Sequence, residues 1–344
     1  TTGSIAMKSI LGRGVPSLSC RKGFGWVEKY NTPVFTMMSA QFSMGNRFLQ
    51  QWFEDDLKWA LTSDISELRK MSSRDGYASL IETEEESIEA VDSLRACRWI
   101  AYDVETVGRQ FNKDFEIISL AITGDEMEDA YIWSGDAIKE SSIMAPVLEM
   151  LADESVKKVA QNAKYDATSI YAYFGTQVKN LSIDTRLLRK ILEPESKASL
   201  DVMQELCGMG GGKEIASNAI KMTTRKIQRA KNDIDLAEIG PLAWTKPIKD
   251  KRYHPGVYAY GMLDPEIRDR YCGRDAVSTA RLAEIFEEKI SREKGLKTVW
   301  SEIMLPAARA IEKVEAWGVY VDQDMARKFS ESVSERIGIV HEKI

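Results

Sequence analysis

The sequence predicts an α/β fold, with helices flanking a sheet, because short apolar, β-branched runs alternate with helical patterns through its middle. The run EIISLAIT at residues 116–123 suits a buried strand. Thr83 and Glu86 form a capping-box pattern, which opens a helix that ends near Arg95. The expected strands, in chain order, are 77–81, 99–106, 116–123, 130–133 and 156–160, and a further helix is expected over 143–152.

Three segments of this region are apolar except where they place carboxylates: WIAYDVET (Asp103, Glu105), VAQNAKYDA (Asp166) and RYCGRDAVST (Tyr271, Asp275). Residues two apart share a face of a strand, so Asp103 and Glu105 project together. Residues four apart share a face of a helix, so Tyr271 and Asp275 do the same. Each pattern alone is common by chance. Four gathered carboxylates, however, repel one another and lose hydration unless cations neutralise them, so the three segments together predict a two-metal site.

The three segments resemble the three motifs of the DnaQ-like 3′–5′ exonucleases, in the subclass whose third motif is Y-x-x-x-D. NAKYD at 162–166, DTRLLRKILEP from Asp184 and ASLDVMQELCG from Ala198 resemble the proofreading domain of family A DNA polymerases. The resemblance covers about residues 77–290 and implies a ribonuclease H-like fold, a mixed sheet flanked by helices.

The resemblance also implies a mechanism in which two metal ions clamp the scissile phosphate. It implies four direct or water-mediated metal ligands: Asp103, Glu105, Asp166 and Asp275. Hard oxygen ligands favour Mg²⁺ or Mn²⁺ over Zn²⁺. Tyr271, with an ordinary pKa of about 10, is a poor base, so we expect it to orient or relay a proton.

Four further residues match family positions close to the scissile strand: Thr106, Asn162, Lys164 and Tyr165. Tyr165 is next to a predicted ligand, where it either stacks on a base or packs in the core.

A basic segment offsets the net charge of −6: six cations and one acid, Glu214, lie between Lys213 and Lys231. If this segment is helical, Lys221, Arg225 and Arg229 form one cationic stripe that either follows a phosphate backbone or is simply solvated. Gly208–Gly212 precedes it and lacks the spacing of a phosphate-binding loop, so a hinge is the expectation.

The flanks carry two further resemblances. The sequence from Leu305, with a Gly-Val-x-Val-Asp turn at 318–322, resembles the first helices of a family A polymerase domain without its catalytic motifs. The first 65 residues resemble the back half of a uracil-DNA-glycosylase-like domain, with Met38 in place of the histidine, or form an unassigned α/β segment. Met38 cannot donate a hydrogen bond, so we expect this segment to be structural. The predicted domains are 1–65, 76–295 and 296–344.

Composition narrows the chemistry. The two histidines, His254 and His341, are too few for a paired-histidine zinc site, and a Ser/His/Asp triad is not indicated. The four cysteines are dispersed and predict reduced thiols. No run is long enough to span a membrane, so we expect a cytoplasmic protein, in the host cytoplasm if it is phage-encoded.

Three functions remain open. The first is a 3′–5′ DNA exonuclease that proofreads for a bacteriophage-like family A polymerase. Its expected partners are single-stranded 3′ ends, primer-template DNA and a polymerase domain in the same or a longer chain. The second is an RNA-trimming exonuclease of the same fold, which the Gly318–Asp322 segment argues against. The third is a non-catalytic DNA- or polymerase-binding scaffold, which the complete set of site residues argues against.

Overall fold

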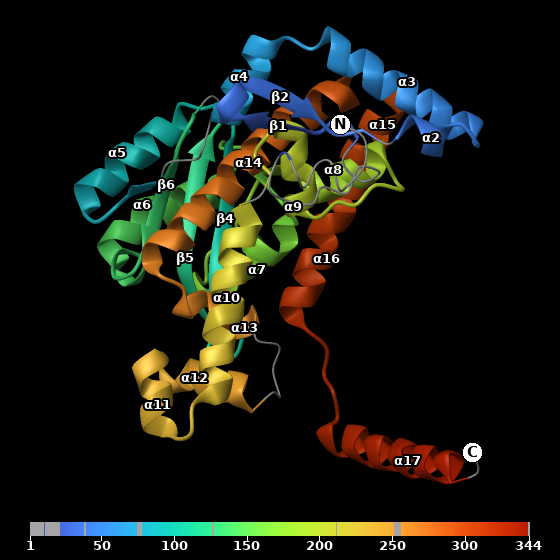
Figure 1. The fold of residues 1–344 in the computed structure, drawn as a ribbon. Helices are drawn as coiled ribbons and strands as arrows, with labels where there is room; N and C mark the ends of the chain where they lie inside the picture. Colours follow the sequence, from blue (N-terminus) through green and yellow to red (C-terminus); the bar gives the residue numbers. More distant parts are fainter. Residues whose placement is uncertain are drawn as a thin grey trace. The chain divides into compact units, whose positions relative to one another are not determined.

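The computed structural model describes Ile10 and residues 21–37, 39–73, 78–125, 127–210, 212–250 and 256–342. The chain divides into two compact units, Thr1–Leu305 and Pro306–Ile344. Figure 1 shows the elements of each unit.

A six-stranded mixed sheet forms the centre of the first unit, in the order β3-β6-β5-β4-β7-β8. β5 runs antiparallel to its neighbours β4 and β6, and the other neighbouring pairs are parallel. This is the ribonuclease H-like arrangement, so the predicted fold class is confirmed. The strands are β3 (Ala78–Leu80), β4 (Ile100–Val107), β5 (Glu116–Gly124), β6 (Ala130–Ser134), β7 (Lys158–Ala160) and β8 (Leu181–Asp184).

The two faces of the sheet pack against different helices because side chains alternate along β4. Ile100, Tyr102 and Val104 join one core cluster, together with residues of α5 (Glu84–Arg95) and α6 (Ser141–Ala152). Ala101 joins the other cluster, with α14 (Pro265–Ser291), which packs across β4, β5 and β6. The face of β4 that carries Asp103 and Glu105 therefore looks toward α14.

The first helix begins where the sequence predicts. Thr83 and Glu86 form the full capping box at the start of α5. Ser87 then donates a hydrogen bond to the Ile143 carbonyl at 2.6 Å and accepts one from the Trp133 indole at 3.1 Å, which ties α5 to the region of α6 and β6. The other elements of this part of the chain are η2 (Ala137–Lys139), α7 (Ala163–Phe174), α8 (Thr185–Leu192), α9 (Leu200–Met203), η3 (Gln204–Cys207), α15 (Lys294–Thr298) and η5 (Val299–Met304).

A group of helices lies between η3 and α14 in the chain and has its own small core, which includes Ile227, Leu236, Ile248 and Tyr258. The Tyr258 hydroxyl donates a hydrogen bond to the Asp114 carboxylate at 2.5 Å. The backbone at Gly261 lies so close to β4 that an added Cβ would be 2.6 Å from Val107. These two contacts fix the group to the end of β4. Its elements are α10 (Gly212–Arg229), α11 (Asp233–Ile239), α12 (Leu242–Lys249), α13 (Gly256–Ala259) and η4 (Tyr260–Met262). His254 lies outside the described residues.

The N-terminal part contains an antiparallel hairpin of β1 (Phe24–Val27) and β2 (Thr32–Phe35), followed by three helices. It belongs to the same compact unit as the sheet. Met38, on which the glycosylase comparison depends, lies outside the described residues, so that resemblance stays a prediction. The connecting 3-10 turn and the helices are η1 (Glu28–Tyr30), α2 (Ala40–Ser43), α3 (Arg47–Thr62) and α4 (Ile65–Ser73).

The second unit contains most of α16 (Leu305–Trp317) and all of α17 (Gln323–His341). Gly318 has a φ of +71° after α16, and Asp322 caps α17 by accepting hydrogen bonds from two backbone N–H groups. The predicted helix, turn and helix are therefore present, whereas their assignment to a polymerase domain stays a prediction. In the described part of the chain, no helix has the length and apolar character needed to cross a membrane.

Candidate active site

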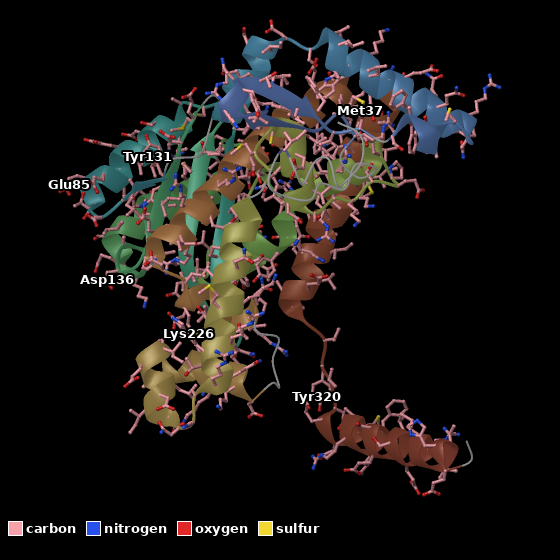
Figure 2. All side chains as sticks on the ribbon, viewed as in Figure 1. Met37, Glu85, Tyr131, Asp136, Lys226 and Tyr320 are labelled. Atoms are coloured by element: carbon pink, nitrogen blue, oxygen red, sulfur yellow. The ribbon has the colours of Figure 1, made fainter. Side chains whose placement is uncertain are left out.

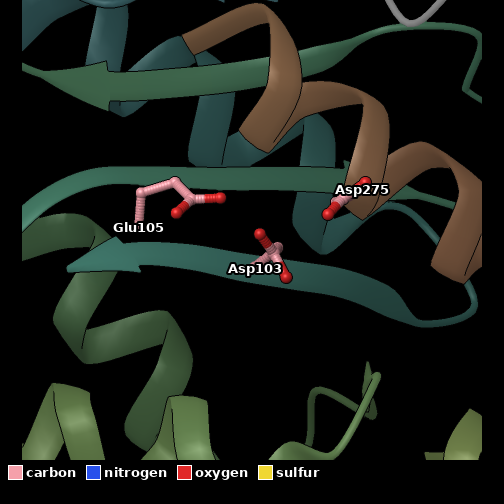
Figure 3. A group of neighbouring side chains, drawn as sticks. All are labelled: Asp103, Glu105 and Asp275. Carbon is pink, nitrogen blue, oxygen red and sulfur yellow. The ribbon is translucent and has the colours of Figure 1, made fainter. Parts of the chain in front are cut away.

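Three carboxylates meet between β4 and α14. Asp103 and Glu105 come from the strand and Asp275 from the helix, and one oxygen of each lies within 4.8 Å of the others. Figure 3 shows the three side chains pointing toward one another. Glu105 and Asp275 are buried and Asp103 is half-buried. The alternation predicted for β4 and the helical spacing before Asp275 thus bring these groups to one place.

The cluster is electrostatically unfavourable as long as all its members are ionised. Burial raises the pKa of Asp103 well above its ordinary value, and the charges of Asp166, Asp275 and Glu105 raise it further. Burial and the neighbouring Asp275 do the same to Glu105, whereas nearby Arg268 lowers the pKa of Glu105. Bound cations would remove this penalty, and the all-oxygen donor set fits a hard divalent ion.

Asp166 borders this cluster without joining the three closest carboxylates. It is buried on the first turn of α7, and its pKa is raised well above normal by burial and, more weakly, by the charges of Asp184 and Asp275. The backbone N–H of Val104 acts in the opposite direction. Asp166 is thus a neighbour of β4 and of the acidic cluster.

Asp184 sets the start of α7. Its carboxylate accepts hydrogen bonds from Asn162 and Ala163 at 3.2 and 2.9 Å, and from Arg186 and Leu187 at 2.9 and 3.1 Å. One buried carboxylate therefore caps both α7 and α8, which suits the positive ends of the two helices.

Tyr271 lies one helical turn before Asp275 on α14. Burial, followed by the charges of Asp275 and Glu105, raises the pKa of its phenol far above the ordinary value. Tyr260 lies beside it, with ring centroids 6.0 Å apart, and burial and Glu105 raise the pKa of Tyr260 as well. Sequence reasoning missed Tyr260, whose only signal is an aromatic residue shortly before the Asp264-Pro265 helix start.

Of the four residues that match family positions close to the scissile strand, Thr106 and Tyr165 contact each other. The Thr106 and Tyr165 hydroxyls lie 2.7 Å apart, and Tyr165 is 43% exposed, so part of its ring faces solvent and is not packed in the core. Asn162 accepts a hydrogen bond from Arg186 at 3.1 Å, and Lys164 is half-buried on the first turn of α7.

The cationic stripe lies on the predicted helix. Lys221, Arg225 and Arg229 are exposed on α10, and within the described residues none of them forms an ion pair. Lys226, labelled in Figure 2, is exposed on the same helix. Two of the preceding glycines leave no room for a side chain, since a Cβ at Gly208 would lie 2.6 Å from the Phe24 ring and a Cβ at Gly210 would clash with the Glu205 carboxylate. Gly211 lies outside the described residues.

Sequence reasoning also missed two neighbours of the carboxylates. The Gln204 amide donates to Asp275 at 2.8 Å, and the Cys272 thiol lies 3.7 Å from an Asp103 carboxylate oxygen. Neither had a sequence signal, because each contact joins residues that are distant in the chain.

The sheet order and the acidic cluster define a ribonuclease H-like exonuclease fold. A model of 3′–5′ exonucleases matches residues 78–291, and the chain belongs to this family. All of the acidic residues and Tyr271 lie inside the matched range.

Two curated relatives illustrate the similarity. DNA polymerase I of Chloroflexus aurantiacus is 24% identical over 265 residues, which cover 74% of this chain and 24% of that protein. The DNA polymerase of Escherichia phage T5 is 22% identical over 245 residues, covering 71% of this chain and 26% of that one. The chain thus spans about a quarter of the length of the curated relatives it matches.

The similar solved structures are more distant in sequence than these relatives. The POL domain of Pol1 from M. smegmatis, in complex with a DNA primer-template and dNTP, has a TM-score of 0.49 and 15% identity, over 77% of this chain and 36% of that one. Escherichia coli RNase D has a TM-score of 0.43 and 15% identity, over 71% of this chain and 52% of that one.

Proposed function

We propose that this protein is a metal-dependent exonuclease that removes nucleotides from the 3′ end of DNA and proofreads for a family A DNA polymerase. The single observation that carries the proposal is the meeting of Asp103, Glu105 and Asp275 at the centre of the sheet, with Asp166 beside them. The curated relatives named as DNA polymerases support DNA as the substrate.

Four carboxylates would hold two Mg²⁺ or Mn²⁺ ions: Asp103, Glu105, Asp166 and Asp275. When bound, the ions would supply positive charge that stabilises the pentacoordinate phosphorus of the transition state. In turn, the carboxylates fix the position of the scissile phosphate relative to β4 and α14, and they remain ionised there because the cations offset their repulsion.

Tyr271 acts as a donor in this scheme. Because its pKa lies far above the ordinary value, its phenol stays protonated at neutral pH and donates a hydrogen bond to the reacting phosphate or to the attacking water. It orients this group and does not act as the base.

The exposed ring of Tyr165, with its hydroxyl held by Thr106, offers a surface for stacking the terminal base. Asn162 and Lys164 belong to the same helix start and would contact the strand beside it. Further away, Lys221, Arg225 and Arg229 would bind the phosphate backbone of the incoming single strand.

The direct test is digestion of matched 3′-labelled DNA and RNA strands in Mg²⁺, in Mn²⁺ and in chelator. We expect metal-dependent release of nucleotides from the 3′ end of DNA, and a loss of orders of magnitude in Asp103→Asn. Asp136→Asn, at an exposed carboxylate labelled in Figure 2, is the matched control and should cleave like the wild type.

Other outcomes reject parts of the proposal. Faster digestion of the RNA strand would replace DNA by RNA as the substrate. Absence of cleavage in both strands, with DNA binding retained, would make the protein a scaffold.

A further inference from the structure

Gln204 is a buried amide directly behind Asp275. Its side chain is 1% exposed, and its Nε2 donates to Asp275 Oδ1 at 2.8 Å and to Ser278 Oγ at 3.0 Å. Ser278 donates in turn to the Asp275 backbone carbonyl at 3.1 Å. Both hydrogens of the amide are used, and one of them is committed to a carboxylate of the candidate metal site.

This hydrogen bond acts against the repulsion within the cluster. One oxygen of Asp275 lies within 4.8 Å of oxygens of Asp103 and Glu105, so like charges on these carboxylates repel one another when no cation lies between them. An N–H donor on Oδ1 fixes the rotation of the carboxylate and thereby the place of its other oxygen. A carboxylate that is fixed in this way loses less freedom when it binds an ion.

The segment that carries Gln204 is held from both sides. Met209 N–H donates to the Gln204 carbonyl at 2.9 Å, and Arg274 of α14 donates to the Met209 carbonyl. On the other side, Gly208 has a φ of +72°, and a Cβ there would lie 2.6 Å from the ring of Phe24. Phe24 belongs to β1, is fully buried and leaves no room for any residue but glycine at position 208.

We propose that Gln204 is a positioning residue for Asp275, and that Phe24 of the N-terminal hairpin sets the place of Gln204. The proposal rests on the proposed function in so far as Asp275 holds a divalent ion. It gives the N-terminal hairpin, which lies outside the residues matched by the exonuclease family, a part in shaping the active site.

Gln204→Met tests the first half, because methionine keeps the length of the side chain and loses the donor. We expect Mn²⁺ to bind about 10–100-fold more weakly in calorimetry without DNA, as is typical when a partner of a metal ligand is lost. The Mn²⁺ concentration that gives half-maximal cleavage should rise in parallel, whereas KM for the DNA strand should stay unchanged.

Ser278→Ala is the matched control. It removes a hydrogen bond of the same amide but leaves the bond to Asp275, so Mn²⁺ affinity should change by less than about twofold. Equal losses in both variants would show that the pocket is only structural, and unchanged Mn²⁺ binding in Gln204→Met would overturn the proposal.

A double-mutant cycle tests the second half. If Phe24 acts through Gln204, Phe24→Ala should weaken Mn²⁺ binding, and the double variant should bind no more weakly than Gln204→Met alone. Additive losses would show that Phe24 acts independently. If circular dichroism shows that Phe24→Ala does not fold, Phe24→Leu replaces it in the double-mutant cycle.

The outcomes separate the two proposals. If the wild type cleaves no 3′ end and Gln204→Met still binds Mn²⁺ more weakly, the exonuclease function is rejected and the role of Gln204 stands. If the wild type cleaves normally and Gln204→Met has unchanged Mn²⁺ affinity, the exonuclease function stands and the role of Gln204 is rejected.

Discussion

At the scale of single residues, the site is governed by what burial does to ionisable groups. Burial raises the pKa of Asp103, Glu105 and Asp166, as well as that of the Tyr271 phenol. For the carboxylates, burial and mutual repulsion favour the protonated form when no cation is bound, and a bound divalent cation would favour the ionised form. For the phenol it means that the proton stays in place at neutral pH.

Tyr271→Phe should therefore lower kcat by about 10²–10⁴-fold, because it removes the donor and retains the packing of the ring. The metal dependence and KM should change little. Tyr260→Phe is the matched comparison, since Tyr260 is the neighbouring phenol on η4, and its loss should be smaller. Single-turnover cleavage of a 3′-labelled strand measures both variants. A Tyr271→Phe enzyme with wild-type kcat would contradict the assignment.

The pH dependence of stability follows from the raised pKa values of the cluster. A raised folded-state pKa means that the metal-free protein gains stability below the ordinary carboxyl pKa of about 4 and loses it as the pH rises through the folded value. Asp103→Asn removes one of these charges. We expect it to have a higher free energy of unfolding than the wild type at pH 8 in chelator, with the difference vanishing near pH 4.

Urea unfolding of both proteins at several pH values measures this difference. Saturating Mn²⁺ should reverse the order at pH 8, because only the wild type keeps the full ligand set. A wild type that is more stable than Asp103→Asn in chelator at every pH would show that repulsion in the cluster is already balanced by the protein.

At the scale of elements, α10 presents the three exposed cations of the stripe on one helix, and their contact with DNA is a prediction. Replacing Lys221, Arg225 and Arg229 by glutamine should weaken single-strand binding without changing kcat at saturating DNA. Each lost phosphate contact should flatten the slope of log affinity against log salt by roughly 0.7. Salt titration in Ca²⁺, chosen as a metal expected to give little turnover, measures the slope.

A charge-matched control uses three exposed lysines outside α10, each replaced by glutamine: Lys58 of α3, Lys113 in the turn between β4 and β5, and Lys294 of α15. This variant has the same net charge as the first one. If its slope changes as much as that of the α10 variant, the effect comes from net charge and the stripe is only a solvated face.

The elements that could be predicted from sequence are those with a local signal. Thr83 and Glu86 fix the start of α5, and the apolar runs give β5 and β6 nearly to the residue. β8 was missed, because its residues Leu181–Asp184 form a four-residue strand without a distinctive pattern. The short helices after α10 had no expectation either, since their small core depends on contacts with one another.

At the scale of the whole molecule, spacing within each motif predicted which carboxylates would share a face, but no spacing could predict the distances between motifs. The fold decides that Asp103, Glu105 and Asp275 form the tight group and that Asp166 borders it. It also decides contacts such as those of Gln204 and Tyr260, which need the tertiary structure.

The division into two units gives the last prediction. Every residue assigned to the site lies in Thr1–Leu305, and Pro306–Ile344 forms a unit of its own. Within the second unit, apolar side chains such as Trp317, Tyr320 and Phe329 are 94%, 93% and 70% exposed, so its helices bury little apolar surface among the described residues. A chain ending at Leu305 should therefore keep the kcat and the Mn²⁺ affinity of the full chain.

In the chain ending at Leu305, the helix content measured by circular dichroism should fall by the contribution of α16 and α17. The temperature of the main unfolding transition should not change. The control is a chain that starts at Tyr77, which keeps the residues matched by the exonuclease family and lacks Phe24. We expect this variant to bind Mn²⁺ more weakly, because η3 loses the ring that packs on Gly208. Loss of cleavage on removal of residues 306–344 would show that the second unit contributes directly to the active site.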